Sequence, residues 1–410
     1  MRRRWKWISG FLFAAILAAG FWIWSRPSSP PPKRSLAHAP SPIPQWPLSA
    51  AMSAVKPRIQ AADHSGEIDV CGVGKVKIDR DDWTATGKFF NALTKKLRLR
   101  WLSALRNSDD YRARATGLYL EGVFDRDEPR KDPEAARDEL VQLALATQDP
   151  AIFALANTKC IRGVEDFPSP GACPQLTLEQ WTRADSDNAV PWLELAVRAR
   201  KENDSTAEAA AFARAALAHQ YESYNWSMFA FAQASMPSDA TAADRWYLTA
   251  DLLGVEAAMP MPYLTVFQYC SREAMSDATV HRQCSALANL LVNKATTLLE
   301  LSLGKSLGTR VGWPPEVIDK LTQQLNASMQ ALAQMGPSGP DDQWSCDSVA
   351  RGNAFMSEWD RLGERGLAKA EIERSGETVA ELAHKFSDGM EKIRREAEAS
   401  AQSQSAAAQP

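Results

Sequence analysis

The chain has 410 residues, of which 45% are hydrophobic, and a formal net charge of -3. A chain of this length and apolar content can bury one large core or two moderate ones, which excludes an intrinsically disordered protein. The charge is nearly balanced, and no basic patch stands out along the sequence. Because nucleic-acid affinity depends largely on neutralising phosphates, we expect no nucleic-acid partner.

The chain begins with a hydrophobic segment, residues 8–24, that carries no charge over 17 residues. As a helix it would span roughly 26 Å, against roughly 30 Å for a bilayer core. Tryptophans lie at both ends, where indoles prefer the membrane interfaces: Trp5, Trp7, Trp22 and Trp24. The segment is predicted to be a transmembrane signal anchor; a cleaved signal peptide and a buried soluble helix are the alternatives.

The charges around this segment predict its orientation. Four basic residues and no acidic residue precede it: Arg2, Arg3, Arg4 and Lys6. By the positive-inside rule, residues 1–7 stay in the cytoplasm and the bulk of the chain is exported. We therefore expect a single-pass inner-membrane protein whose bulk is periplasmic.

Two short regions follow before the main domain. Residues 25–62 form a linker with nine prolines, which behaves as a semi-rigid spacer. Residues 63–80 alternate apolar and polar residues around Gly72 and Gly74, which predicts a short extended segment, either a hairpin or a single strap. The third glycine of a dinucleotide-binding fingerprint is missing, so no such cofactor is expected.

Residues 81–399 are typical of helices separated by short breaks. Helix starts are marked by Asp132 with Pro133, by Asp149 with Pro150, and by a capping box of Thr177 and Gln180. Short connections favour antiparallel helix pairs, so the fold class is predicted to be all-α, built as an α-solenoid behind the anchor and linker. Residues 400–410 are predicted to be a disordered tail.

One helix pair resembles a known repeat. Residues 185–216 are similar to a single degenerate tetratricopeptide unit, on the positions of Trp192, Leu195, Ala196, Phe212 and Ala215. Glu208 departs from the pattern, since it stands where the repeat usually has alanine, and no second copy follows at 34 residues. The resemblance implies a helical-repeat architecture, in which Trp192 and Phe212 fill the space between the two helices.

The six cysteines form an even set, which is typical of disulfides in an exported protein. Locality favours Cys160 with Cys173 and Cys270 with Cys284, and leaves Cys71 with Cys346 as a long-range pair. The alternative is that some of them are buried thiols. No cysteine pair has the spacing of zinc ligands, so we expect no metal site.

No catalytic or cofactor motif is recognisable. The sequence Gly304, Lys305, Ser306 lacks the first glycine of a phosphate-binding loop, because Leu299 occupies that position, and no nucleotide is expected. Aromatic residues suggest a binding groove for a peptide or glycan, with core packing as the alternative: Tyr221, Tyr224, Trp226, Trp246 and Tyr247.

These features predict a membrane-anchored periplasmic scaffold or interaction module with a protein partner in the cell envelope. The alternative is an envelope enzyme, or a glycan- or peptide-binding protein, with an unrecognised aromatic-lined site. A third interpretation is a sensor or assembly factor whose membrane helix pairs with another through small residues.

Overall fold

The computed structural model describes residues 65–79, 83–124, 133–163, 171–224, 227–257, 259, 262–335 and 344–407. This part of the chain is helical apart from one small sheet. The segments predicted as cytoplasmic N-terminus, membrane anchor and linker, residues 1–7, 8–24 and 25–62, lie outside the described residues.

The predicted fold class is wrong as stated, because it included a transmembrane helix. Among the residues that the structure describes, no helix is both long and apolar enough to cross a membrane. The finding for these residues is an all-helical chain that carries one two-stranded sheet.

The sheet is an antiparallel hairpin of β1 (Ser65–Val70) and β2 (Gly74–Asp79), which decides between the hairpin and the single strap. Gly72 and Gly74 have φ of 81° and 91°, a left-handed conformation that glycine adopts without steric cost. Ile68 and Val70 are buried against helices of the main domain. The hairpin is therefore held by its apolar face.

The helices of the first half are α3 (Trp83–Arg106), α4 (Tyr111–Leu120), α5 (Pro133–Thr147), α6 (Pro150–Gly163), η1 (Cys173–Gln175), α7 (Leu178–Ala184), α8 (Ala189–Lys201) and α9 (Ser205–Ala215). Two of the predicted caps are formed here. Asp149 Oδ1 accepts the backbone N–H groups of Ala151 and Ile152 (3.0 and 3.2 Å), and Thr177 with Gln180 makes the capping box of α7.

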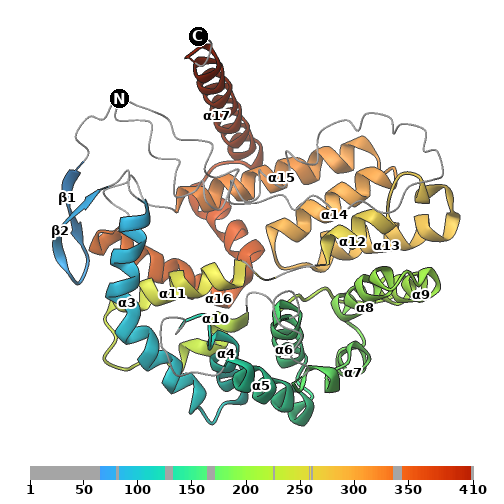
Figure 1. The fold of residues 1–410 in the computed structure, drawn as a ribbon. Helices are drawn as coiled ribbons and strands as arrows, with labels where there is room; N and C mark the ends of the chain where they lie inside the picture. Colours follow the sequence, from blue (N-terminus) through green and yellow to red (C-terminus); the bar gives the residue numbers. More distant parts are fainter. Residues whose placement is uncertain are drawn as a thin grey trace.

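The helices of the second half are α10 (Ser227–Gln233), α11 (Ala242–Ala257), α12 (Tyr263–Tyr269), η2 (Ala274–Ser276), α13 (Ala278–Lys294), α14 (Leu298–Arg310), α15 (Pro315–Gln334), α16 (Cys346–Ser375) and α17 (Val379–Ala407). In Figure 1, α11 and α16 lie between the lower group of α4, α5 and α6 and the upper group of α13, α14 and α15.

The helices form a closed circuit. Neighbouring helices pack from α3 through α9 in chain order, α8 and α9 contact α12 and α13, and packing continues through α14 and α15 to α16. The circuit closes because α16 packs on α11 and α11 packs on α3. In an open α-solenoid the first and last helices stay apart, so the solenoid prediction is corrected for the described helices.

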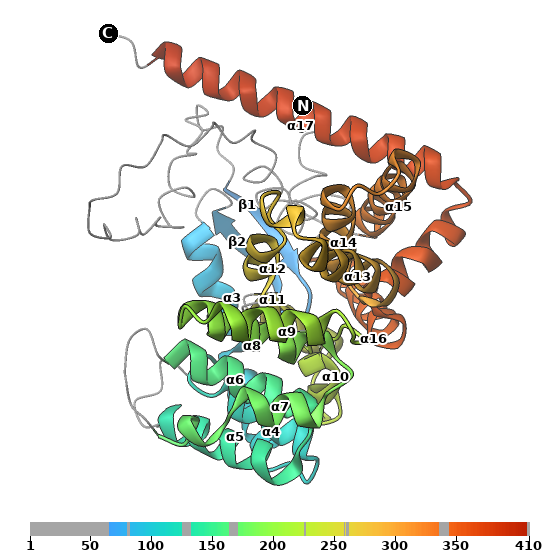
Figure 2. The ribbon, with the colours of Figure 1, turned by 90° about the vertical axis from the view of Figure 1, so that its right-hand side faces the viewer.

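The last helix differs from the rest. The start of α17 packs on α15, where Leu382 and Ala383 are buried with Ala327, and the remainder extends away from the other helices (Figures 1 and 2). The helix continues to Ala407, so the predicted disordered tail is wrong for residues 400–407. Alanine and glutamine favour helix, and residues 400–407 contain no glycine or proline.

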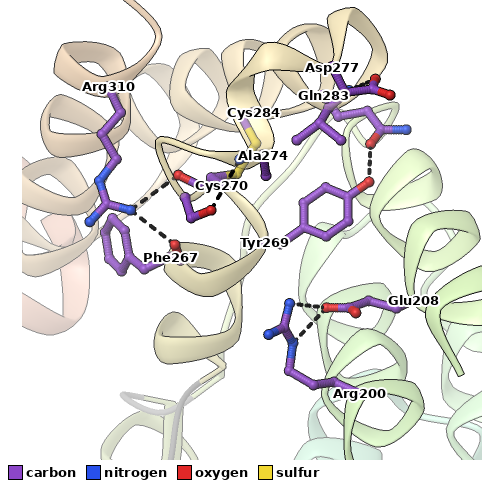
Figure 3. The surroundings of a disulfide bond; sticks show 12 residues. Arg200, Glu208, Phe267, Tyr269, Cys270, Ala274, Asp277, Gln283, Cys284 and Arg310 are labelled. Atoms are coloured by element: carbon purple, nitrogen blue, oxygen red, sulfur yellow. Dashed lines mark hydrogen bonds and ion pairs between the residues drawn. A yellow bond between two sulfur atoms is a disulfide. The ribbon is translucent and has the colours of Figure 1, made fainter. Parts of the chain in front are cut away.

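All three predicted disulfides are present, and no cysteine among the described residues is free. The Cys71–Cys346 bond joins the hairpin turn to the first residue of α16 across 275 residues. The other two close short segments, 160–173 and 270–284. Next to Cys270, the Arg310 guanidinium donates to the carbonyls of Phe267 and Cys270 (3.0 and 3.1 Å) and so satisfies the C-terminal end of α12 (Figure 3).

The repeat-like segment forms the pair α8 and α9. Glu208, the residue that departs from the repeat pattern, is buried and accepts a hydrogen bond from Arg200 of α8 (2.7 Å; Figure 3). Phe212 is fully buried, and its ring stacks on Tyr269 of α12 with centroids 3.7 Å apart. Trp192 is half-buried and lies beneath the Arg214 guanidinium. Phe212 thus connects this pair to the next part of the circuit.

Candidate functional site

The aromatic residues predicted to form a binding groove do not form one surface. Tyr221 is buried in the main core, whereas Tyr247 is buried in the separate cluster against the hairpin. Trp246 packs against both clusters, and Trp226 lies outside the described residues. Of the four that are described, Tyr224 alone lines the cavity described below. The four described residues therefore do not line one groove.

The physical reason is that the α11 aromatics pack the hairpin and α16. The Tyr247 hydroxyl donates to the carbonyl of Cys71 (3.3 Å), and its ring lies 6.3 Å from that of Trp344. The neighbouring residue Trp246 packs directly on Gly352 of α16. A Cβ at Gly352 would come within 2.5 Å of the Trp246 indole. These side chains hold the circuit closed, which is the core-packing alternative.

A cavity of ≈ 330 Å³ lies where the two sides of the circuit meet. Its walls come from α4, α6, the loop before α10, α10 itself, α11, the turn before α14, and α16. Four aromatic side chains line it: Tyr224, Phe229, Phe231 and Trp359. Pockets of this size with a few polar groups on apolar walls are typical ligand sites, so we take this as the candidate site.

Glu256 of α11 is the most unusual polar group of the cavity. The residue is 0% exposed, and its Oε1 accepts the backbone N–H of Phe229 (3.1 Å). Its Oε2 has no hydrogen-bond partner within the described part of the chain. Burial raises the pKa of the Glu256 carboxyl to about 8, since a carboxylate is poorly solvated there. The group is therefore mostly protonated at neutral pH.

Glu364 contributes a second carboxyl from a break in α16. Gly363 has φ 66° and ψ 171°, a backbone conformation essentially restricted to glycine, and it kinks the helix. Glu364 Oε2 then accepts the N–H of Leu298, the first residue of α14 (2.8 Å). Burial raises the pKa of Glu364 to about 7, and the nearby Glu300 adds to the rise.

Glu300 lies behind this position, on α14. Its side chain accepts the N–H of Thr297 (3.1 Å) in a capping box, and it is 1% exposed. Burial raises its pKa to about 7, and the charge of Glu222 adds to the rise. The first turn of α14 thus holds two buried carboxyl groups, stabilised by its N–H groups and helix dipole.

The loop before α10 presents Tyr224 and Glu222 to the cavity. Tyr224 has φ 59°, which is uncommon for a residue with a side chain. It is held there because its hydroxyl donates to Asp185 (3.0 Å), its N–H donates to Glu222 (2.9 Å), and its carbonyl accepts the Ser227 hydroxyl (2.6 Å). Burial raises the pKa of Glu222 and of Asp185. Such held conformations cluster at functional sites.

Arg112 of α4 supplies a guanidinium to the wall. Its Nε and Nη2 contact Asp149 Oδ2 (2.9 and 2.8 Å), and the group lies 5.2 Å from the centre of the Phe231 ring. Asp149 therefore compensates the charge of Arg112. Arg112 is thus not available as an ion-pair partner for the glutamates of the cavity.

The cavity is thus an aromatic-walled space that offers acceptor oxygens from several glutamates. Within the described residues, no group of three or more His, Cys, Asp or Glu side chains is arranged to hold a metal ion. The unpartnered Oε2 of Glu256 can accept a hydrogen bond from a ligand, or donate one when the carboxyl is protonated.

Sequence reasoning did not identify the glutamates. A usable signal exists for Glu256, which is a lone charge in the apolar run "LLGVEAAM". Glu364 follows a glycine inside a long helical pattern, which indicates a break. Neither signal shows that the two side chains share a cavity.

Comparison of the chain with family models, with curated proteins and with solved structures finds no match. The resemblance of residues 185–216 to a tetratricopeptide unit therefore gains no support from them.

Proposed function

We propose that this chain is an interaction module of an oxidising compartment, such as the periplasm, and that it binds a ligand in the Glu256 cavity. The observation that carries the proposal is the unpartnered Oε2 of the fully buried Glu256, which lines that cavity. A buried polar atom without a partner costs about 1–3 kcal/mol, more when charged. A ligand that supplies the partner would recover this free energy.

The backbone around the cavity supports the same proposal. Tyr224 and Gly363, which both line the cavity, adopt positive φ. A positive φ at a residue with a side chain, such as Tyr224, costs stability, and so does the conformation of Gly363. The surrounding contacts must offset both costs. Two of them at one cavity are more consistent with a shaped site than with a packing defect.

The disulfides support the proposed oxidising compartment. Three cysteine pairs are bonded, and none of these cysteines is free. Disulfides persist in the periplasm and other oxidising spaces and are rare in the reducing cytosol. A periplasmic location therefore fits the chemistry of this chain.

Ligand-dependent thermal unfolding of the full chain tests the proposal. The panel comprises short peptides, cell-wall glycan fragments, amino acids and aliphatic amines. Ala230 is exposed on α10 at the cavity, so Ala230→Trp should fill the site without disturbing the core. Ala210, exposed on α9 and outside the cavity, provides the matched variant Ala210→Trp.

At 100 times its Kd, a ligand stabilises the folded chain by about 2.7 kcal/mol. We expect one class of compound to raise the unfolding midpoint of the natural chain and of Ala210→Trp, and to have no effect on Ala230→Trp. If no class stabilises the chain, or if every stabilising class acts equally on Ala230→Trp, the cavity is not the binding site.

A second candidate function is an enzyme that acts on glycan. The specific observation in its favour is that Glu256 and Glu364, with pKa values raised to about 8 and about 7, face the same aromatic cavity. A protonated carboxyl beside another carboxyl is what acid-catalysed glycoside cleavage requires. New reducing ends from cell-wall glycan, lost in Glu364→Gln, would support the enzyme; their absence with the natural chain would exclude this activity on that glycan.

A further inference from the structure

We infer that the cavity takes a small ligand with a primary ammonium group, which donates an N–H hydrogen bond to Glu256 Oε2. This inference rests on the proposed binding function and names the chemical class of its ligand. Its first support is geometric, since Glu256 lines the cavity and its Oε2 is buried without a hydrogen-bond partner among the described residues. An ammonium offers three donors and no acceptor, so it suits a wall of carboxyl oxygens.

The charges that face the cavity support a cationic ligand. Besides Glu256, its titratable residues are Arg112, Glu222, Tyr224, Asp360 and Glu364. Arg112 is the one cation among them, and it is paired with Asp149. The walls therefore present carboxyl groups whose ionised form a bound cation would stabilise.

Among the described residues, no cation acts on the Glu256 carboxyl, and Arg365, which follows Glu364 on α16, donates to the carbonyl of Ala295 (2.8 Å). The segment of α10, "SMFAFAQ", has no titratable residue, and α16 contributes the acids Asp360 and Glu364 to the cavity. On α3, Arg98 contacts Asp251 of α11 (3.2 Å) and is thereby paired. An anionic ligand would meet these acids without a free positive partner, which argues against it.

The aromatic walls and the size of the cavity narrow the ligand further. Phe229 and Trp359 line the space, and aromatic faces attract ammonium groups. The volume of ≈ 330 Å³ lies at the lower end of the range for ligand pockets. The site therefore fits a short aliphatic amine, or a lysine side chain inserted from a partner.

Binding is coupled to release of a proton. The Glu256 carboxyl, with its pKa raised to about 8, is mostly protonated at pH 7 in the free protein. When the ammonium binds, the carboxyl O–H bond breaks, the proton passes to solvent, and the carboxylate accepts the ligand N–H. Affinity therefore rises with pH until the carboxyl is ionised, by about 50-fold between pH 6 and pH 8.

Isothermal titration of the full chain with butylammonium chloride tests the inference. Repeating it at pH 7 in buffers of different ionisation enthalpy gives the number of protons released. We expect about one proton per bound ammonium, no binding of the neutral analogue butan-1-ol, and the pH dependence given above. Acetyl-lysine amide, with a free side-chain amine, distinguishes an inserted lysine from a free amine.

Two glutamine variants separate Glu256 from other buried acids. Glu256→Gln should lower the affinity for butylammonium at least tenfold and abolish the proton release. Glu194, whose pKa burial raises to about 7, lies on α8 outside the cavity wall, so Glu194→Gln should change neither.

Each outcome decides between the two proposals. Butylammonium binding without proton release, or unchanged in Glu256→Gln, would overturn the role of Glu256. If no amine binds but a neutral ligand is lost in Ala230→Trp, the ammonium inference fails and the binding function stands. If no ligand stabilises Ala210→Trp more than Ala230→Trp, both the ammonium inference and the binding function fail.

Discussion

Replacing Glu256 by glutamine should make the stability of the chain less dependent on pH. The folded carboxyl has a pKa of about 8, against 4.5 for an ordinary glutamate, as in the unfolded chain. A raised carboxyl pKa contributes stability below the unfolded value, and this contribution is lost as pH rises through the folded value. Glutamine has the same shape and does not ionise, so this loss is absent in the variant.

The magnitude follows from the two pKa values of Glu256. Between pH 5 and pH 8 the unfolded carboxyl is ionised while the folded one is mostly not, so each pH unit costs the natural chain up to about 1.36 kcal/mol. Over the whole interval the free energy of unfolding of Glu256→Gln, relative to the natural chain, should rise by roughly 3 to 4 kcal/mol.

Urea unfolding at pH 5, 6, 7 and 8, with the disulfides intact, measures this difference. Glu202→Gln serves as the control, because Glu202 is exposed at the C-terminal end of α8. Parallel pH profiles for the natural chain and Glu256→Gln would refute the reasoning, since they would mean that burial does not hold the Glu256 proton.

Three further changes test the fold. Removing the disulfide 71–346 by serine substitution should cost about 5 kcal/mol in the free energy of urea unfolding, against about 3 kcal/mol for the disulfide 160–173, because it closes a far longer loop; equal losses would contradict the loop-length argument. Gly363→Ala should destabilise the chain by about 1–3 kcal/mol because Gly363 has a φ of 66°. Gly254→Ala should instead stabilise it by about 0.5–1 kcal/mol, because Gly254 lies in α11 with open space around it. If thermal unfolding gave stability changes of the same sign for both variants, the described kink would be contradicted. Phe212→Ala should cost about 3–5 kcal/mol by urea unfolding, since the ring is fully buried, and a loss below 1 kcal/mol would show that the site is not packed as described.

Local features of the fold could be predicted from the sequence because their causes are local. The capping box of Thr177 and Gln180 needs residues three apart, and Asp149 caps the helix that begins next to it. The hairpin follows from alternation around two glycines. Even the disulfide 71–346 could be predicted, although by elimination, since the other four cysteines have close partners.

The closed circuit and the cavity could not be predicted, because both depend on contacts between distant segments. Nothing in the local sequence of α11 shows that it packs on both α3 and α16. For the same reason Trp246 and Tyr247 were expected at a groove, although they pack the hairpin and α16. The partner of Glu364, the first N–H of α14, is likewise distant in the chain.

The protonation state of Glu256 tests the account most directly. Isotope-edited infrared difference spectra of the natural chain and Glu256→Gln isolate the carbonyl stretch of this one carboxyl group. At pH 7 the free protein should show the band of a protonated carboxyl, and saturation with butylammonium should replace it with carboxylate bands. A carboxylate in the free protein at pH 7, or a protonated band that persists at saturation, would contradict the account.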